Sequence, residues 1–298
     1  MKKVIKTLLI ALLMLTIILT ASAGIFAIFF FSGYEVFRDV SYGAEENNTM
    51  DIYIPNSAYE TGACGCVLFI HGGSWAGGDK SEEALRSRMV ANSGYIAATM
   101  NYTLFTAENA DKFSAEVVLD EIDAALEKIS VFARERGVTV TKAATAGYSA
   151  GAHLSMLYSY SRNESAPLEI VFTANMAGPA DFSEQIWGER AEIIGERLVG
   201  KAFTNEALSK EEKTTLLASV APVSFISSDT PPSLFAYGGR DTTVSEENGK
   251  SVKEKFDEAG VSYDYILFPA SNHALISNPL KRIEYDLALL DYCERYFK

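Results

Sequence analysis

A five-residue pattern, Gly-Tyr-Ser-Ala-Gly at residues 147–151, constrains the fold of this chain more than any other feature. Residues 142–146 before it have the composition of a buried strand, and residues 153–158 after it that of an apolar helix face. The flanking glycines leave room for strand and helix to approach each other, and the turn holds Ser149 at a strained backbone position. The pattern therefore predicts a strand–turn–helix unit that projects the Ser149 hydroxyl, a candidate nucleophile, above a sheet.

A second glycine turn lies upstream. His71-Gly72-Gly73 follows the continuous apolar run Cys-Val-Leu-Phe-Ile at 66–70, which is typical of a strand buried on both faces. Backbone N–H groups of Gly72 and Gly73, together with that of Ala150, are placed to stabilise the oxyanion that forms when Ser149 attacks a carbonyl group. The alternative interpretation is a plain glycine turn before a helix that starts near Asp79.

A nucleophilic serine needs a base, and the chain has three histidines. His71 belongs to the glycine turn, where its ring would brace the loop. His153 lies one helical turn after Ser149, and a hydrogen-bonded core histidine is the favoured interpretation there. His273 follows the apolar run 263–268, at a strand end of the kind where α/β enzymes collect their active groups. We therefore predict that His273 is the base.

The acid that orients the base should also follow a strand. Asp241 stands in a glycine-opened loop directly after the apolar run 233–237, where it could fix the tautomer of His273. Asp229 precedes that strand and Asp264 lies inside the next one, so both are weaker candidates. A surface aspartate is the remaining alternative for Asp241.

The order Ser149, Asp241, His273 is that of the α/β-hydrolase triad. His-Gly-Gly-Ser-Trp at 71–75, Asn101-Tyr102, Gly-Tyr-Ser-Ala-Gly-Ala-His-Leu from 147, Gly-Gly-Arg-Asp-Thr-Thr-Val from 238 and Ser-Asn-His-Ala from 271 occur in this order. Together they resemble the esterase/lipase group of the α/β-hydrolase superfamily over roughly residues 36–298. The resemblance is greatest to its hormone-sensitive-lipase-like and acetyl- or feruloyl-esterase-like branch. Ser74, where many relatives carry a third glycine, and the absence of a proline after Val244 are departures from the pattern.

The resemblance implies a serine hydrolase of small-molecule carboxylic esters, working through an acyl-enzyme without metal or cofactor. A peptidase or amidase of the prolyl-oligopeptidase type shares the triad order, but such enzymes usually carry a large propeller domain before the hydrolase domain. A non-catalytic binding protein on the same fold is the alternative from a different class.

The alternation of strand and helix patterns predicts a mostly parallel sheet covered by helices on both faces. We expect an antiparallel opening pair at 36–43 and 50–55, then strands near 66–71, 94–100, 142–147, 169–176, 233–238 and 263–269. Helical spacing of apolar residues predicts a long helix over 112–136.

Residues from about 180 to 228 break the alternation, because they are helical in pattern and mixed in polarity. A helical cap over the active site is the expectation for an insertion at this point in the hydrolase domain, residues 34–298. Its apolar residues would either line an acyl pocket or pack the insertion onto the core; they include Trp187, Ile193, Ile194, Leu198, Phe203, Leu216 and Leu217.

Residues 1–33 form a separate N-terminal segment. Lys2, Lys3 and Lys6 precede 25 uncharged residues, Thr7 to Phe31, which as a helix would be about 37 Å long and could cross a hydrocarbon core of about 30 Å. The basic flank favours a single-pass anchor in the cell membrane with an extracytoplasmic catalytic domain. A signal peptide cleaved after Ala21-Ser22-Ala23, giving a secreted protein, is the alternative.

Charge and cysteine content argue against nucleic acid, anionic membrane surfaces, disulfides and zinc. The formal net charge is −13, and without the three N-terminal lysines it is −16, from 23 basic and 39 acidic residues. Such a balance disfavours nucleic acid and anionic membrane surfaces as ligands. Cys64, Cys66 and Cys293 suggest neither a disulfide framework nor a zinc site.

Overall fold

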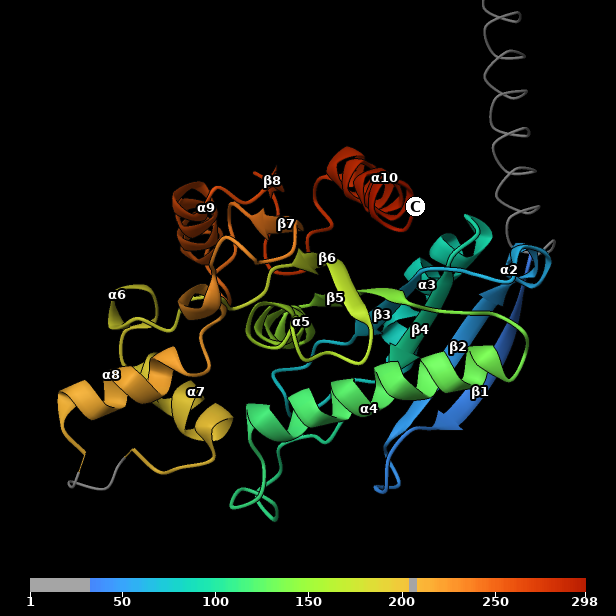
Figure 1. The fold of residues 1–298 in the computed structure, drawn as a ribbon. Coiled ribbons are helices and arrows are strands. Elements are labelled where there is room, and N and C mark those ends of the chain that lie inside the picture. Colours follow the sequence, from blue (N-terminus) through green and yellow to red (C-terminus); the bar gives the residue numbers. More distant parts are fainter. Residues whose placement is uncertain (1–32, 204–207) are drawn as a thin grey trace, which may run out of the picture.

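The computed structural model describes residues 33–203 and 208–298 (Figure 1). Its strands are β1 (Tyr34–Ser41), β2 (Thr49–Pro55), β3 (Cys66–Ile70), β4 (Ile96–Met100), β5 (Lys142–Tyr148), β6 (Glu169–Met176), β7 (Ser233–Gly238) and β8 (Tyr263–Phe268). Its α-helices are α2 (Asn56–Thr61), α3 (Ala84–Asn92), α4 (Ala115–Arg134), α5 (Ala150–Ser161), α6 (Glu184–Trp187), α7 (Arg190–Val199), α8 (Lys210–Ala218), α9 (Glu247–Ala259) and α10 (Pro279–Tyr296). Two 3₁₀ helices are η1 (Lys80–Glu83) and η2 (Pro222–Phe225).

The strands form one sheet in the order β1-β2-β4-β3-β5-β6-β7-β8. β2 pairs antiparallel with β1 and β4, and every pair from β4 to β8 is parallel. Because the carboxyl ends of parallel strands meet at one edge, the loops after β3, β5, β7 and β8 converge there.

Helices cover both faces of the sheet, as its continuous apolar strands require. Side chains of alternate residues in β3 enter two separate core clusters, one against α4, α5 and α9 and the other against α3 and α10. Figure 1 shows α4 and α5 on one side of the sheet and α10 on the other. The edge strand β8 is only partly buried, since it has a neighbour on one side alone.

The turn from β5 to α5 depends on two glycines. A methyl group at Gly151 would lie 2.0 Å from the carbonyl oxygen of Ile70, and one at Gly147 would lie 2.4 Å from the carbonyl carbon of Gly151. No real Cβ is accommodated at such distances from backbone atoms, so only glycine lets the first turn of α5 rest on β3. Between them Ser149 has φ 55° and ψ −120°, a region that non-glycine residues rarely adopt.

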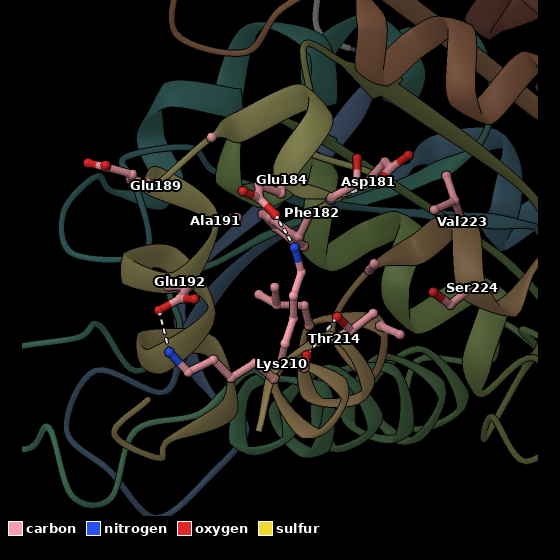
Figure 2. Close-up of a pocket in the computed structure, with 16 residues that line it drawn as sticks. Asp181, Phe182, Glu184, Glu189, Ala191, Glu192, Lys210, Thr214, Val223 and Ser224 are labelled. Carbon is pink, nitrogen blue, oxygen red and sulfur yellow. Dashed lines mark hydrogen bonds and ion pairs between the residues drawn. The ribbon is translucent and has the colours of Figure 1, made fainter. Parts of the chain in front are cut away.

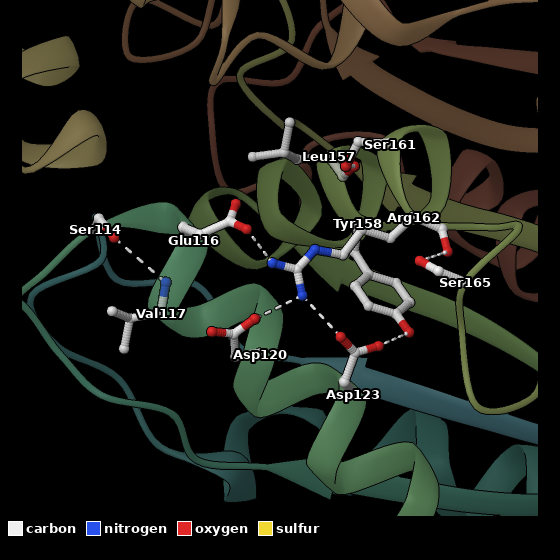
Figure 3. Close-up of polar contacts among 10 residues, drawn as sticks. All are labelled: Ser114, Glu116, Val117, Asp120, Asp123, Leu157, Tyr158, Ser161, Arg162 and Ser165. Carbon is white, nitrogen blue, oxygen red and sulfur yellow. Dashed lines mark hydrogen bonds and ion pairs between the residues drawn. The ribbon is translucent and has the colours of Figure 1, made fainter.

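The other end of α5 is attached to α4 by an ion-pair network (Figure 3). Arg162, just after α5, pairs with Asp120 at 2.8 Å, with Asp123 at 2.7 Å and with Glu116. These carboxylates share one face of α4, and the Tyr158 hydroxyl donates a further bond to Asp123, with 2.6 Å between the oxygens. A network of this kind restrains α5 better than an isolated surface pair would, and α5 carries Ser149 at its start.

The predicted sheet is confirmed strand by strand, with shifts of at most two residues at the ends. The long helix, Ala115–Arg134, is shorter at both ends than predicted. It starts later because the Ser114 hydroxyl accepts a bond from the Val117 N–H and caps it. Helices α6, α7 and α8 lie between β6 and β7, where the alternation was expected to break.

The predicted membrane anchor falls almost entirely outside the described residues and stays a prediction. Among the residues that are described, none of the helices has the length and apolar character needed to cross a bilayer.

The packing of α5 on β3 generates a stability prediction. Gly151→Ala should lower the free energy of unfolding by about 3 kcal/mol or more, because the new methyl group meets two backbone carbonyls that cannot move aside. Gly33→Ala is the matched control, since that position has ordinary φ and nothing within 4 Å. Thermal unfolding of both variants beside the parent chain measures the effect, and a Gly151→Ala variant as stable as the control would contradict this packing.

Candidate active site

Three side chains predicted from the sequence meet at the carboxyl edge of the sheet. The Oγ of Ser149 lies 2.9 Å from Nε2 of His273, and Nδ1 of His273 lies 2.7 Å from Oδ2 of Asp241. A carboxylate only accepts hydrogen bonds, so Nδ1 carries the proton and Nε2 is free to accept from the serine hydroxyl. The loops after β5, β7 and β8 supply these three residues, as the sequence predicts.

Asp241 and His273 differ in how far they are buried. The Asp241 side chain is fully buried, whereas that of His273 is 23% exposed. The other carboxylate oxygen of Asp241 accepts the backbone N–H groups of Thr243, at 2.8 Å, and Val244, at 3.0 Å. Both oxygens of Asp241 are therefore occupied and its orientation is fixed, which in turn fixes the ring of His273.

Tyr148 also positions the histidine, a contact that the sequence did not indicate. Its hydroxyl donates to the backbone carbonyl of His273 at 2.6 Å, and the two rings lie 5.3 Å apart. Burial raises the pKa of Tyr148 to about 12, so its hydroxyl keeps its proton and remains a donor. Its place in the Gly-Tyr-Ser-Ala-Gly turn is the only signal that could have suggested this contact.

The glycine turn after β3 lies against the serine. A methyl group at Gly72 would lie 3.3 Å from the Cβ of Ser149. Within the described residues the N–H groups of Gly72, Gly73 and Ala150 donate to no protein acceptor. They are the donors that the sequence predicts for an oxyanion, and they lie on the two segments that adjoin the Ser149 side chain.

His71 braces this turn, as its position suggests. Its Nδ1 lies 2.7 Å from the carbonyl oxygen of Gly72, and its ring stacks on Tyr102 at 4.4 Å. Burial lowers the pKa of His71, so the ring is held neutral.

His153 is the hydrogen-bonded core histidine expected from its position, and it connects three segments. Its Nδ1 accepts the indole N–H of Trp75 at 3.1 Å, and its Nε2 donates to the carbonyl of Val220 at 2.8 Å. Trp75 belongs to a strained loop, because Gly73, Ser74 and Trp75 all have positive φ. A neutral His153 is therefore one of the contacts that hold the loop after β3 in this conformation.

A cavity of about 290 Å³ opens beside Ser149 and Ala150. Trp75 lines it from the loop after β3, and Trp187, Ile193 and Ile194 line it from the helical insertion. Leu198 and Phe203 of the insertion are buried against the protein instead. Leu216 and Leu217 belong neither to the lining of the cavity beside Ser149 nor to the buried residues, because they face two other cavities of the insertion.

An eight-stranded α/β sheet with a serine at a strained strand–helix turn, joined to a histidine and a buried aspartate, defines an α/β-hydrolase of the esterase/lipase group. Comparison with known families agrees: the BD-FAE family profile matches residues 50–256. The chain belongs to the BD-FAE family.

Similar proteins include named esterases. A probable isoprenylcysteine alpha-carbonyl methylesterase of Oryza sativa subsp. japonica is 36% identical over 77 residues, 26% of this chain and 18% of that protein. Esterase LipC of Mycobacterium tuberculosis is 22% identical over 248 residues, 79% of this chain and 59% of that protein. The chain thus spans less than two thirds of either relative.

Solved structures share the fold. A truncated carbohydrate esterase from gut microbiota superposes with a TM-score of 0.71 at 16% identity, covering 88% of this chain and 96% of the other. An inhibited esterase B from Lactobacillus rhamnosis gives 0.69 at 20% identity, covering 88% and 87%.

Burial of His153 makes stability depend on pH. Its pKa is lowered from 6.5 to about 4 by desolvation. Between these values the unfolded chain binds a proton at this position and the folded chain does not, so stability is lost as the pH falls from about 6.5 to about 4. The loss attributable to this residue is about 3 kcal/mol.

His153→Gln tests this, because a glutamine amide can replace both hydrogen bonds but does not titrate. Urea unfolding at several pH values from 7 to 4 should show a steeper loss of stability in the parent chain than in the variant. Parallel pH profiles would mean that the pKa of His153 is the same in the folded and the unfolded chain, and would contradict the prediction.

Proposed function

We propose that this chain hydrolyses small-molecule carboxylic esters through an acyl-enzyme on Ser149, with His273 as the base and Asp241 as the group that orients it. One observation carries the proposal: His273 places one ring nitrogen 2.9 Å from the Ser149 hydroxyl oxygen and the other 2.7 Å from Asp241. Membership of the BD-FAE family and the similar esterases support ester hydrolysis as the reaction.

The proposed reaction has two acyl transfers. Nε2 of His273 takes the hydroxyl proton while Oγ of Ser149 bonds to the ester carbonyl carbon, and the carbonyl oxygen becomes an oxyanion. The intermediate collapses by breaking the bond to the alkoxy oxygen, which leaves as the alcohol with the proton from His273. Water then attacks the acyl-serine with the same base, and the acid leaves as Ser149 regains its proton.

The oxyanion would be stabilised by the N–H groups of Gly72, Gly73 and Ala150. These donors belong to backbone that the neighbouring packing already holds in place, so little reorganisation accompanies the reaction. Loss of one such donor typically lowers the rate by about 10²–10³.

We also propose that residues 1–33 hold the catalytic domain on the outer side of the cell membrane. The proposal rests on the uncharged run from Thr7 to Phe31 behind three lysines. The full chain should stay with membranes through a high-pH carbonate wash. Release by that wash, or an N-terminus that begins after Ala23, would favour a secreted protein.

The catalytic assignment predicts non-additive losses. Ser149→Ala and His273→Ala should each lower kcat by roughly 10⁴–10⁶, and the double variant by little more, because the residues act as one unit. Hydrolysis of p-nitrophenyl esters, from acetate to long acyl chains, measures this for the full chain.

Ser93→Ala, at an exposed helix end far along the chain from the site, is the matched control and should keep the parent rate. Additive losses, or hydrolysis that persists in Ser149→Ala, would contradict the assignment. The acyl chain length with the highest rate would define the size of the acyl group accepted.

A further inference from the structure

One face of α7 lines the cavity beside Ser149. Arg190, Ile193, Ile194 and Arg197 of α7 all line the cavity, and their spacing of three, four and seven residues defines one helix face. Two isoleucines are thus bracketed by two arginines. Ile193 is 65% exposed, so nothing in the described residues covers this apolar surface.

The arginines lack counter-charges. In the part of the chain that the structure describes, neither Arg190 nor Arg197 forms an ion pair, and no Asp or Glu lines the cavity. Burial lowers the pKa of Arg197, and no neighbouring carboxylate offsets that effect. The chain has 39 acidic residues, yet among the described ones none forms an ion pair with either guanidinium group beside the candidate nucleophile.

Aromatic rings and a backbone carbonyl hold both groups in place. The Arg190 guanidinium carbon lies 5.2 Å from the centre of the Trp187 ring, and that of Arg197 lies 4.3 Å from the Phe105 ring. One nitrogen of Arg197 donates to the carbonyl of Ser74 at 3.0 Å. The other N–H groups of each guanidinium are suited to donate hydrogen bonds to a planar anion such as a carboxylate.

A second cavity on another side of α7 provides a comparison (Figure 2). It measures about 420 Å³, and charged residues of both signs line it. There Lys210 pairs with Glu184 at 3.0 Å, and Lys213 pairs with Glu192 at 2.8 Å. Each lysine of the second cavity is therefore paired with a carboxylate, whereas the described residues supply no carboxylate to the two arginines beside Ser149, which points to a charge that the substrate supplies.

We propose that the preferred substrate is an ester that carries a carboxylate next to an apolar portion, with the carboxylate bound by Arg190 and Arg197 and the apolar portion by Ile193 and Ile194. The proposal rests on the ester hydrolysis proposed above and narrows its substrate class. The net charge of −13 repels anions in general, so a preference for an anionic ester would come from this local pair.

Two pairs of matched substrates test the preference in the full chain. 4-Acetoxybenzoate and 4-acetoxybenzamide differ in charge on the alcohol side. Mono-p-nitrophenyl adipate and p-nitrophenyl methyl adipate differ in charge on the acyl side. In at least one pair, kcat/KM for the anionic ester should exceed that for the neutral one by about tenfold, since a hydrogen bond to a charged group typically contributes that much. The preference should shrink as salt is added, and the pair that shows it identifies the charged side of the substrate.

Variants locate the effect. Arg190→Gln should reduce the anionic-to-neutral ratio of kcat/KM several-fold, mainly through KM of the anionic ester. Arg197→Gln should do the same, whereas Arg197→Lys should retain part of the preference. Arg134→Gln removes an exposed arginine of α4 that does not line the cavity, and it should leave the ratio unchanged.

Failure of this proposal is distinguishable from failure of the proposed function. If Ser149 is needed to cleave the neutral esters but the ratio in both pairs is one or less, the anion preference is overturned and the esterase assignment stands. A ratio that is high but unaffected by either glutamine variant would also overturn the role of these arginines. If no ester of either pair is cleaved, ester hydrolysis itself is wrong.

Discussion

The contact between the first turn of α5 and the end of β3 is the constraint on which the site depends. It exists because Gly147 and Gly151 have no side chains, so backbone rests directly on backbone. The strained conformation of Ser149 follows from this contact, since the chain must turn sharply between two packed elements. The same contact between α5 and β3 brings Gly72 against Ser149, so it positions both the Ser149 hydroxyl and the adjacent N–H groups.

The sequence was informative wherever short-range pattern and burial coincide. The parallel strands are continuous apolar runs because both faces are covered, and their predicted ends differ from the observed ones by at most two residues. His273 followed from having few histidines to choose among, and Asp241 from its place after a strand. Each of these inferences needed only composition, order and the rule that loops at the carboxyl edge converge.

Other contacts of the site arise from tertiary structure and left little trace in the sequence. Trp75 and Val220 are far apart in the chain, and nothing local indicates that His153 joins them. The pair Arg190 and Arg197 was not predicted to share a helix face, because their spacing is informative only when the limits of α7 are known. Insertions of short helices with mixed polarity are where pattern reasoning is weakest, since packing rather than propensity determines their limits.

The helical insertion is attached to the loop after β3 at two separate points. Arg197 donates to the carbonyl of Ser74, and Val220 accepts from the ring that binds Trp75. Ser74 and Trp75 are adjacent residues with positive φ, so contacts from both parts of the insertion stabilise the strained stretch. Cavity wall and candidate oxyanion donors therefore belong to one connected unit. A substrate carboxylate bound as proposed would share the Arg197 guanidinium with the Ser74 carbonyl, so the group proposed to recognise the substrate also holds the loop that carries the Gly72 and Gly73 N–H groups.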